Sequence, residues 1–229
     1  MKLVIGNKNY SSWSLRPWIA LTHAGIPFEE ANLRLFTDSF DRDVAVYSAS
    51  GKVPVLVDGD VRVWDSLAIV EYLAERFPEH RLWPADPVAR AYARSICAEM
   101  HSGFANLRSQ MPMNIVAMLP GLGWNRAVQR DIDRIAAIWT DARQRYGQDG
   151  PFLFGQFSNA DAFYAPVVSR FATYGVHLPE PAKAYADFIL ALPAMQQWIE
   201  GARKERDFVV ADEPYRPLPT DPEAVIIDR

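Results

Sequence analysis

The chain has 229 residues, of which 49% are apolar, and a formal net charge of −4 at pH 7. A chain of this length can bury one large core or two modest ones. Acidic and basic residues are interspersed without a basic stripe, which argues against a nucleic-acid binder. The single cysteine, Cys97, excludes an internal disulfide framework and fits a reducing compartment such as the cytoplasm. No apolar run approaches the roughly 20 residues of a membrane-spanning helix, and we expect no signal peptide.

The first 78 residues alternate between strand-like and helix-like patterns. The apolar run 2–5 predicts a buried strand, and segment 16–24 carries the apolar spacing of a helix. We then expect a strand near 30–36, a helical stretch near 39–47, strands at 53–57 and 61–63, and a helix at 66–76. The Asp58-Gly59 pair between two valine-rich runs is typical of a hairpin turn. A βαβ unit followed by a hairpin and a helix makes a small mixed sheet, so we predict an α/β domain over 1–78.

A proline-rich stretch near residue 80 breaks every regular pattern and predicts a domain boundary. After it the pattern is helical, which predicts an all-α second domain over 86–213. The expected helices cover about 87–110, 124–146, 159–174, 181–190 and 193–204. Residues 214–229 are rich in proline and acid, and we predict an irregular tail there.

Two adjacent hydroxyls, Ser11 and Ser12, lie where the first predicted strand passes into the first helix. The amino end of a helix has unpartnered N–H groups and a positive dipole, so an anion, including a thiolate, is stabilised there. Serine is also favoured at this position as a purely structural N-cap. From the residues alone, the N-cap is the simpler interpretation.

Three other short motifs also have purely structural interpretations, as a strand start or a helix cap. Pro54, after Val53, fits the start of a strand with an ordinary trans bond, and Asp65-Ser66 fits the cap of the next helix. Ser158, followed three residues later by Asp161, fits a capping box. We expect replacement of Asp161 to damage folding more than chemistry.

Four short segments, taken in their order and spacing, resemble the motifs of the cytosolic glutathione transferases. They are residues 11–16 (SSWSLR), 52–56 (KVPVL), 65–69 (DSLAI) and 158–161 (SNAD). The resemblance extends over nearly the whole chain and is strongest to the serine-type zeta and theta-like classes. It implies a thioredoxin-like N-terminal domain, an all-helical C-terminal domain, glutathione as co-substrate, a role in detoxification and a homodimer. Trp13 stands where zeta enzymes usually carry a cysteine, which weakens the expectation of their isomerase activity.

The resemblance assigns Ser11 as the hydroxyl that donates to the glutathione thiolate, with Ser12 as the alternative. A free thiol has a pKa of roughly 8.5, and lowering it by about two units takes roughly 2.7 kcal/mol of preferential thiolate stabilisation. A hydroxyl donor and a helix amino end can supply an amount of that order.

The other motifs acquire glutathione-binding roles through the same resemblance. The Val53–Pro54 bond is implied to be cis, leaving the Val53 backbone to pair with the cysteinyl part of glutathione. Lys52 is implied to reach the glycyl carboxylate, although a solvated surface lysine is the alternative. Ser66 is implied to bind the γ-glutamyl carboxylate, with Asp65 near the ammonium group.

For the electrophile pocket, the spacing of His101, Phe104 and Arg108 puts them on one face of the predicted helix. That face suits a pocket, and Arg108 suits an anionic co-substrate, but a solvated or interdomain surface is the alternative. Tyr10 and Trp13 are further pocket candidates, with core packing as the alternative. Four scattered histidines and one cysteine predict no metal site. Arg16 is expected to form an ion pair.

We therefore predict a glutathione transferase that attacks small hydrophobic electrophiles. A glutathione-dependent isomerase or peroxidase would keep the same thiol site with a different pocket. A non-catalytic interaction protein on the same fold is a further alternative, because fold alone does not specify activity.

Overall fold

The N-terminal part is built on a mixed four-stranded sheet in the order β2-β1-β3-β4. The computed structural model describes residues 1–228. The strands are β1 (Lys2–Gly6), β2 (Glu29–Leu33), β3 (Val55–Asp58) and β4 (Val61–Trp64). β1 is parallel to β2 and antiparallel to β3, and β3 forms a hairpin with β4. The predicted mixed sheet and hairpin are confirmed.

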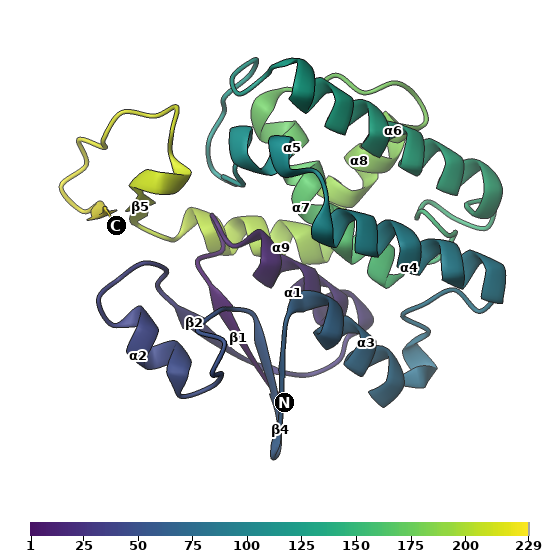
Figure 1. The fold of residues 1–229 in the computed structure, drawn as a ribbon, viewed down its shortest axis with the longest axis horizontal. Coiled ribbons are helices and arrows are strands. Elements are labelled where there is room, and N and C mark those ends of the chain that lie inside the picture. The colour runs from purple at the N-terminus through teal and green to yellow at the C-terminus, as the bar shows by residue number, and fades with distance from the viewer. Residues whose placement is uncertain (229) are drawn as a thin grey trace.

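Three helices accompany this sheet: α1 (Ser12–Ala24), α2 (Phe40–Ala45) and α3 (Ser66–Arg76). α1 and α3 lie between the sheet and the helical remainder, whereas α2 lies on the β2 side (Figure 1). The buried leucine, isoleucine and tryptophan side chains of α1 join the main core. The sheet on one side and the helical remainder on the other therefore fix the position of α1.

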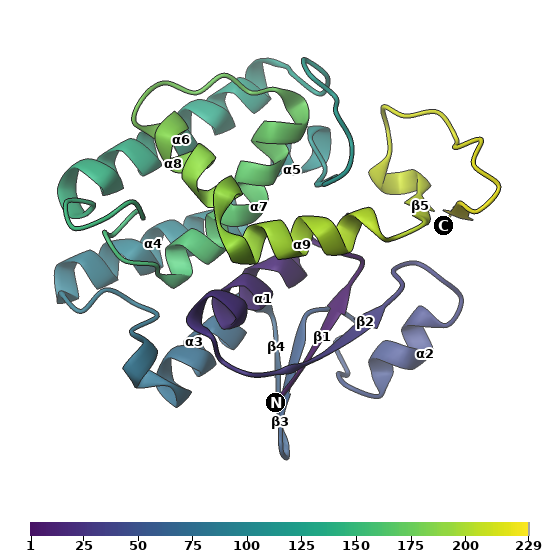
Figure 2. The same cartoon turned by 180° about the vertical axis from the view of Figure 1, so that it is seen from behind.

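The remainder of the chain is helical, after a short 3-10 turn η1 (Pro78–His80). Its helices are α4 (Pro87–Ser102), α5 (Ala105–Gln110), α6 (Arg126–Tyr146), α7 (Asn159–Tyr174), α8 (Ala182–Ala191) and α9 (Pro193–Arg203). α7 is buried along almost its whole length and runs through the middle of this part (Figures 1 and 2). It contacts α1, α4 and α8, so one core continues across both parts.

The prediction of one helix over 87–110 is wrong. The chain leaves the helix at Gly103, and Phe104 adopts a left-handed conformation with φ 56° before α5 begins. At Gly103 a Cβ atom would come within 2.7 Å of the Glu99 carbonyl oxygen, so this exit needs glycine. His101 and Arg108 therefore do not share a continuous helical face.

The predicted irregular tail over 214–229 is wrong at 225–227, which form a strand, and the stretch 86–213, predicted to be all-helical, contains a strand at 207–209. Residues 205–228 are called the tail from here on. β5 (Asp207–Val209) pairs in parallel with β6 (Val225–Ile227), and a short 3-10 turn η2 (Val210–Asp212) follows β5. This segment lies beyond α9, beside the end of the sheet that carries β2 (Figure 2). Within residues 1–228, no helix combines the length and the apolar character needed to cross a membrane.

Candidate active site

Two adjoining cavities share Trp13, Lys52 and Val53 in their walls. The smaller, about 440 Å³, is completed by Ser50, Pro54, Trp64, Asp65 and Ser66. The larger, about 880 Å³, lies between the two parts of the chain, and its wall includes Tyr10, Ser11, Ser12, Phe36, Phe40, Arg108, Pro112, Met113, Arg170 and Asp212. Most of the predicted site residues therefore meet around one continuous space.

The two serines stand at the amino end of α1, and they differ in their hydrogen bonds. The Ser11 hydroxyl donates to Ser14 Oγ at 2.7 Å, and Ser14 Oγ also accepts the Gly6 N–H at 3.1 Å. Ser11 is the N-cap residue, but its side chain makes no capping hydrogen bond. Ser12 makes no side-chain hydrogen bond within the described residues. The hydroxyl of Ser11 is thus oriented by two consecutive hydrogen bonds, the second of which comes from the Gly6 amide of β1.

The amino end of α3 faces the smaller cavity. Asp65, with φ 73°, is the N-cap, and its carboxylate accepts the Leu67 N–H at 2.8 Å. The predicted cap is therefore present. Ser66, at the first position of the helix, is 1% exposed, and its hydroxyl accepts a hydrogen bond from Arg16 at 3.3 Å.

The predicted ion pair of Arg16 is wrong. Its guanidinium carbon lies 4.2 Å from the ring centroid of Trp13 and 4.5 Å from that of Phe163. The residue is 1% exposed, and its Nε has no hydrogen-bond partner within the described chain. Burial lowers the pKa of Arg16 to about 9, which still leaves it charged at neutral pH. A buried cation next to Ser66 without a carboxylate bonded to it favours an anion in the smaller cavity.

The Val53–Pro54 bond is cis, as the resemblance implied, and the interpretation of an ordinary trans proline is wrong. Pro54 is buried, whereas Lys52 is exposed. Lys52 and Val53 stand where the two cavities join.

Two polar side chains predicted for the electrophile pocket, His101 and Arg108, lie against the ring of Trp13. The ring of His101 lies 5.2 Å from that of Trp13, edge to face, and the Arg108 guanidinium lies 5.3 Å from it. Arg108 also donates to the His101 carbonyl at 3.2 Å, so the two meet despite the break in the helix. Phe104 is 8% exposed, belongs to the core and lines neither cavity.

Tyr10 lines the larger cavity, but its hydroxyl is engaged elsewhere. It donates to Glu213 at 2.8 Å and lies 3.1 Å from the Asp207 carbonyl oxygen. Burial and the negative charge of Glu213 raise the pKa of Tyr10. The phenol is held neutral, with its proton directed at the tail.

Three charged residues of the larger cavity were missed from the sequence: Asp41, Arg170 and Asp212. Arg170 lies in the apolar run of α7 and donates from Nε to the Met111 carbonyl at 2.9 Å. Asp212 comes from the tail, and burial raises its pKa to about 6 although the Arg170 charge opposes the shift. A charge inside an otherwise apolar helix was a signal for Arg170, whereas nothing near Asp212 in the sequence indicates its place.

Residues 1–228 hold no group of three or more His, Cys, Asp or Glu side chains arranged to bind a metal ion. Cys97 is buried in α4, and burial raises the pKa of its thiol.

The chain is similar to known proteins over most of its length. Residues 10–76 match the model described as glutathione S-transferase, N-terminal domain, and residues 124–201 match the corresponding C-terminal domain. Maleylacetoacetate isomerase of Rattus norvegicus is 30% identical over 192 residues, which cover 81% of this chain and 87% of the relative. Glutathione S-transferase Z1 of Arabidopsis thaliana is 30% identical over 205 residues, 82% and 89% of the two chains. A glutathione transferase homologue from Burkholderia, solved with bound glutathione, superposes with a TM-score of 0.67 at 25% identity, covering 89% of this chain and 98% of that chain.

Proposed function

Because the chain belongs to the glutathione S-transferase family, we propose that it ionises the thiol of bound glutathione and directs the thiolate at an electrophile in the larger cavity. The observation that carries this proposal is the hydroxyl chain from Ser11 through Ser14 to the Gly6 amide, at the amino end of α1. A serine there donates to sulfur and need not itself ionise.

The smaller cavity is the proposed glutathione site. Ser66, at the amino end of α3, binds the γ-glutamyl carboxylate, and the buried charge of Arg16 supports it. Asp65 lies near the ammonium group, the Val53 backbone beside Pro54 pairs with the cysteinyl unit, and Lys52 reaches the glycyl carboxylate.

Thiolate stabilisation requires the Ser11 proton to turn from Ser14 to the sulfur. Hydroxyl hydrogens rotate readily, so Ser14 can donate to Ser11 once Ser11 donates to sulfur. The Gly6 N–H still binds Ser14 in that arrangement, and a chain of hydrogen bonds polarises each member toward the sulfur. Ser12 is the alternative donor, because its hydroxyl has no partner within the described residues.

The reaction itself needs two bound substrates and an ionised nucleophile. The thiolate forms a bond to the electrophilic carbon, and the leaving group or the adjacent unsaturated centre takes the electron pair. Phe36, Phe40 and Met113 give the larger cavity apolar surface for a small hydrophobic electrophile. Detoxification of such compounds is the role that we propose.

A glutathione-dependent isomerase acting on an acidic substrate is the second candidate function. Arg108 and Arg170 both line the larger cavity, and arginine binds carboxylates well. The name of the rat relative, maleylacetoacetate isomerase, supports this candidate. Product analysis with an isomerisable acid and with a neutral electrophile separates the two activities.

We also propose that the protein is a cytoplasmic homodimer. The single cysteine is compatible with a reducing compartment. The proposal of a dimer comes from the family, and Trp64 on β4 and Val88 on α4, which are 55% and 62% exposed, are candidates for its apolar contacts. Sedimentation of the purified protein tests the dimer.

The experiment that tests the proposed function is a calorimetric titration with reduced glutathione near neutral pH, in two buffers that differ in ionisation enthalpy. Binding with proton release supports thiol ionisation. Binding without release contradicts it and indicates a carrier-like site. No binding at millimolar glutathione would favour a non-catalytic interaction protein.

A further inference from the structure

The turn that precedes Ser11 and Ser12 forms hydrogen bonds to the C-terminal tail. Asn7, Lys8, Asn9 and Tyr10 connect β1 to α1, and the Ser11 N–H donates to the Asn7 carbonyl at 2.8 Å. Asn7 and Asn9 are 2% and 3% exposed. Both form hydrogen bonds to segments about 100 to 200 residues away in sequence.

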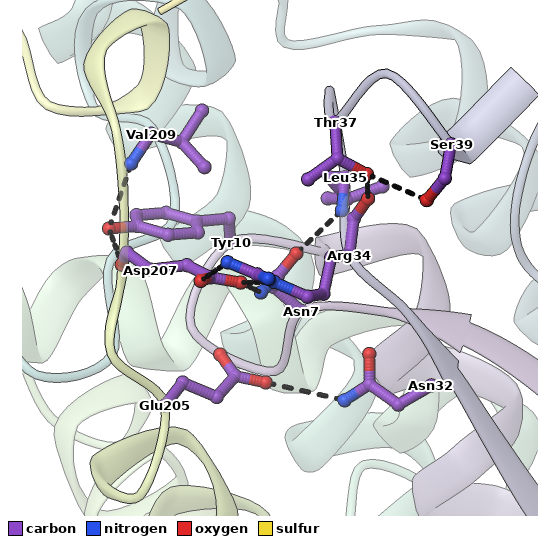
Figure 3. Close-up of polar contacts among 10 residues, drawn as sticks. All are labelled: Asn7, Tyr10, Asn32, Arg34, Leu35, Thr37, Ser39, Glu205, Asp207 and Val209. Carbon is purple, nitrogen blue, oxygen red and sulfur yellow. Dashed lines mark hydrogen bonds and ion pairs between the residues drawn. The ribbon is translucent and has the colours of Figure 1, made fainter. Parts of the chain in front are cut away.

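Glu205 binds the two amides at the start of this turn. One carboxylate oxygen accepts the Lys8 N–H at 2.6 Å, and the other accepts the Asn9 N–H at 2.9 Å. The first amides of a helical turn have no partner within the turn, so a carboxylate is well placed there. Asn32 Nδ2 adds a longer contact to Glu205 at 3.4 Å (Figure 3).

Asp207 holds the next part of the turn through side chains. Its carboxylate accepts from Asn7 Nδ2 at 2.7 Å and from Arg34 Nε at 3.0 Å, while Asn7 Oδ1 accepts the Leu35 N–H at 2.8 Å (Figure 3). The Asn7 side chain therefore forms hydrogen bonds both to the tail and to the segment that follows β2.

Tyr10 is the third attachment, and it immediately precedes Ser11. Its hydroxyl lies among the Asp207 carbonyl, the Val209 N–H and the Glu213 carboxylate (Figure 3 shows the first two). Glu213 is 4% exposed and is also bound by Arg216 at 3.0 Å. One buried residue of the turn is thus fixed by three tail residues.

These tail residues lie outside the matched family domains. The C-terminal domain match ends at residue 201, four residues before Glu205.

We propose that Glu205 is a positioning residue for the thiol site, and that with Asp207 and Glu213 it makes the C-terminal tail a structural part of that site. The proposal rests on the proposed function, since it concerns the orientation of Ser11 and Ser12 toward bound glutathione. The tail sets the angle at which the turn enters α1, and therefore the direction in which the serine hydroxyls point.

The test compares the variants Glu205→Gln and Glu205→Ala with the wild-type full-length protein. Glu200→Gln is the matched control, because Glu200 is an exposed carboxylate of α9 outside the tail contacts. The ultraviolet absorbance of the thiolate gives the pKa of bound glutathione, and steady-state kinetics with a neutral electrophile gives kcat and KM separately. Thermal unfolding of each protein shows whether the fold is retained.

We expect Glu205→Ala to raise the pKa of the bound thiol by about one unit and to lower kcat at neutral pH about tenfold, with little change in KM for glutathione. Glutamine keeps one acceptor for the two amides, so Glu205→Gln should restore part of the loss. Glu200→Gln should match the wild type. If Glu205→Ala unfolds, the glutamine variant alone carries the test.

An unchanged thiol pKa and kcat in the folded Glu205 variants would overturn the proposal. Loss of kcat that follows the fraction of unfolded protein, with a wild-type thiol pKa in the remainder, would also overturn it, because that result indicates stability alone. If the wild-type protein itself does not lower the pKa of bound glutathione, the proposed function fails and not this inference.

Discussion

Ser11 and Ser14 share a 2.7 Å hydrogen bond between their hydroxyl groups, and Ser14 is anchored on the Gly6 amide at the end of β1. A strand and a helix thus jointly orient one hydroxyl in the wall of the larger cavity. Ser12 has no such support, although it lies beside Ser11 in the wall of the larger cavity. Two adjacent serines are therefore distinguishable by experiment.

We predict that Ser11→Ala raises the pKa of bound glutathione by about one to two units, because a hydrogen bond to a charged acceptor is lost. Ser12→Ala should change it by much less. The thiolate absorbance of the complex, followed against pH, measures both values. Ser14→Ala keeps the Ser11 hydroxyl but removes the hydrogen bond that orients it, so it should raise the pKa of bound glutathione less than Ser11→Ala does. A large shift in Ser12→Ala with none in Ser11→Ala would reverse the assignment.

The charge of the larger cavity leads to a prediction on substrate choice. Arg108→Gln should lower kcat/KM for a carboxylate-bearing electrophile about tenfold, because one charge-assisted hydrogen bond is lost. The same variant should act on a neutral electrophile of similar size nearly as the wild type does. Arg130→Gln is the matched control, since Arg130 is exposed on α6 and does not line the cavity. Equal losses with both electrophiles would show that Arg108 does not select for charge.

Local patterns in the sequence predicted most of the fold correctly. Valine-rich runs and the Asp58-Gly59 turn are sufficient for the β3–β4 hairpin, because its register is set by neighbours. The break at Gly103 was missed, since one glycine within a helical pattern is usually tolerated. The pairing of β5 with β6 depends on tertiary contacts, and short strands of three residues have no pattern of their own.

The candidate site divides in the same way. Ser11, Val53 and Ser66 lie in short sequence motifs, so the sequence alone identified them as site candidates. Arg170 and Asp212 come together only because α7 and the tail meet at the cavity. The ion pair between Arg34 and Asp207 joins residues 173 apart, and no local pattern could indicate it.

Asp161 provides a prediction about stability. Its two oxygens accept from the Leu153 N–H, the Ser158 N–H and hydroxyl, and the Tyr185 hydroxyl, at 2.8 to 3.2 Å. In Asp161→Asn an amide NH₂ would replace one acceptor and face donors. We expect a loss of about 3 kcal/mol in the free energy of unfolding, measured by chemical denaturation.

The control for that experiment is Asp60→Asn, an exposed carboxylate in the β3–β4 turn, which should leave the free energy of unfolding unchanged. Glutathione binding by the fraction of Asp161→Asn that remains folded should equal that of the wild type. Weaker binding at wild-type stability would contradict a purely structural role for Asp161.

Asp212 predicts how substrate choice depends on pH. Burial raises its pKa to about 6, against the opposing charge of Arg170, so it is neutral below that pH and negative above it. The ionised form neutralises Arg170 and repels an anionic electrophile. The ratio of kcat/KM for an anionic electrophile to that for a neutral one should therefore fall as pH rises through about 6, and the ratio cancels the ionisation of the thiol itself.

Asp212→Asn should remove this fall and raise the ratio severalfold above pH 6, to the value that the wild type shows at lower pH. Glu223→Gln removes another carboxylate of the tail, one that pairs with Arg206 outside the cavity, and should keep the wild-type profile. A wild-type ratio that does not change with pH would show that Asp212 does not govern the charge met by the substrate. A fall that persists in Asp212→Asn would assign the titration to another group of the cavity.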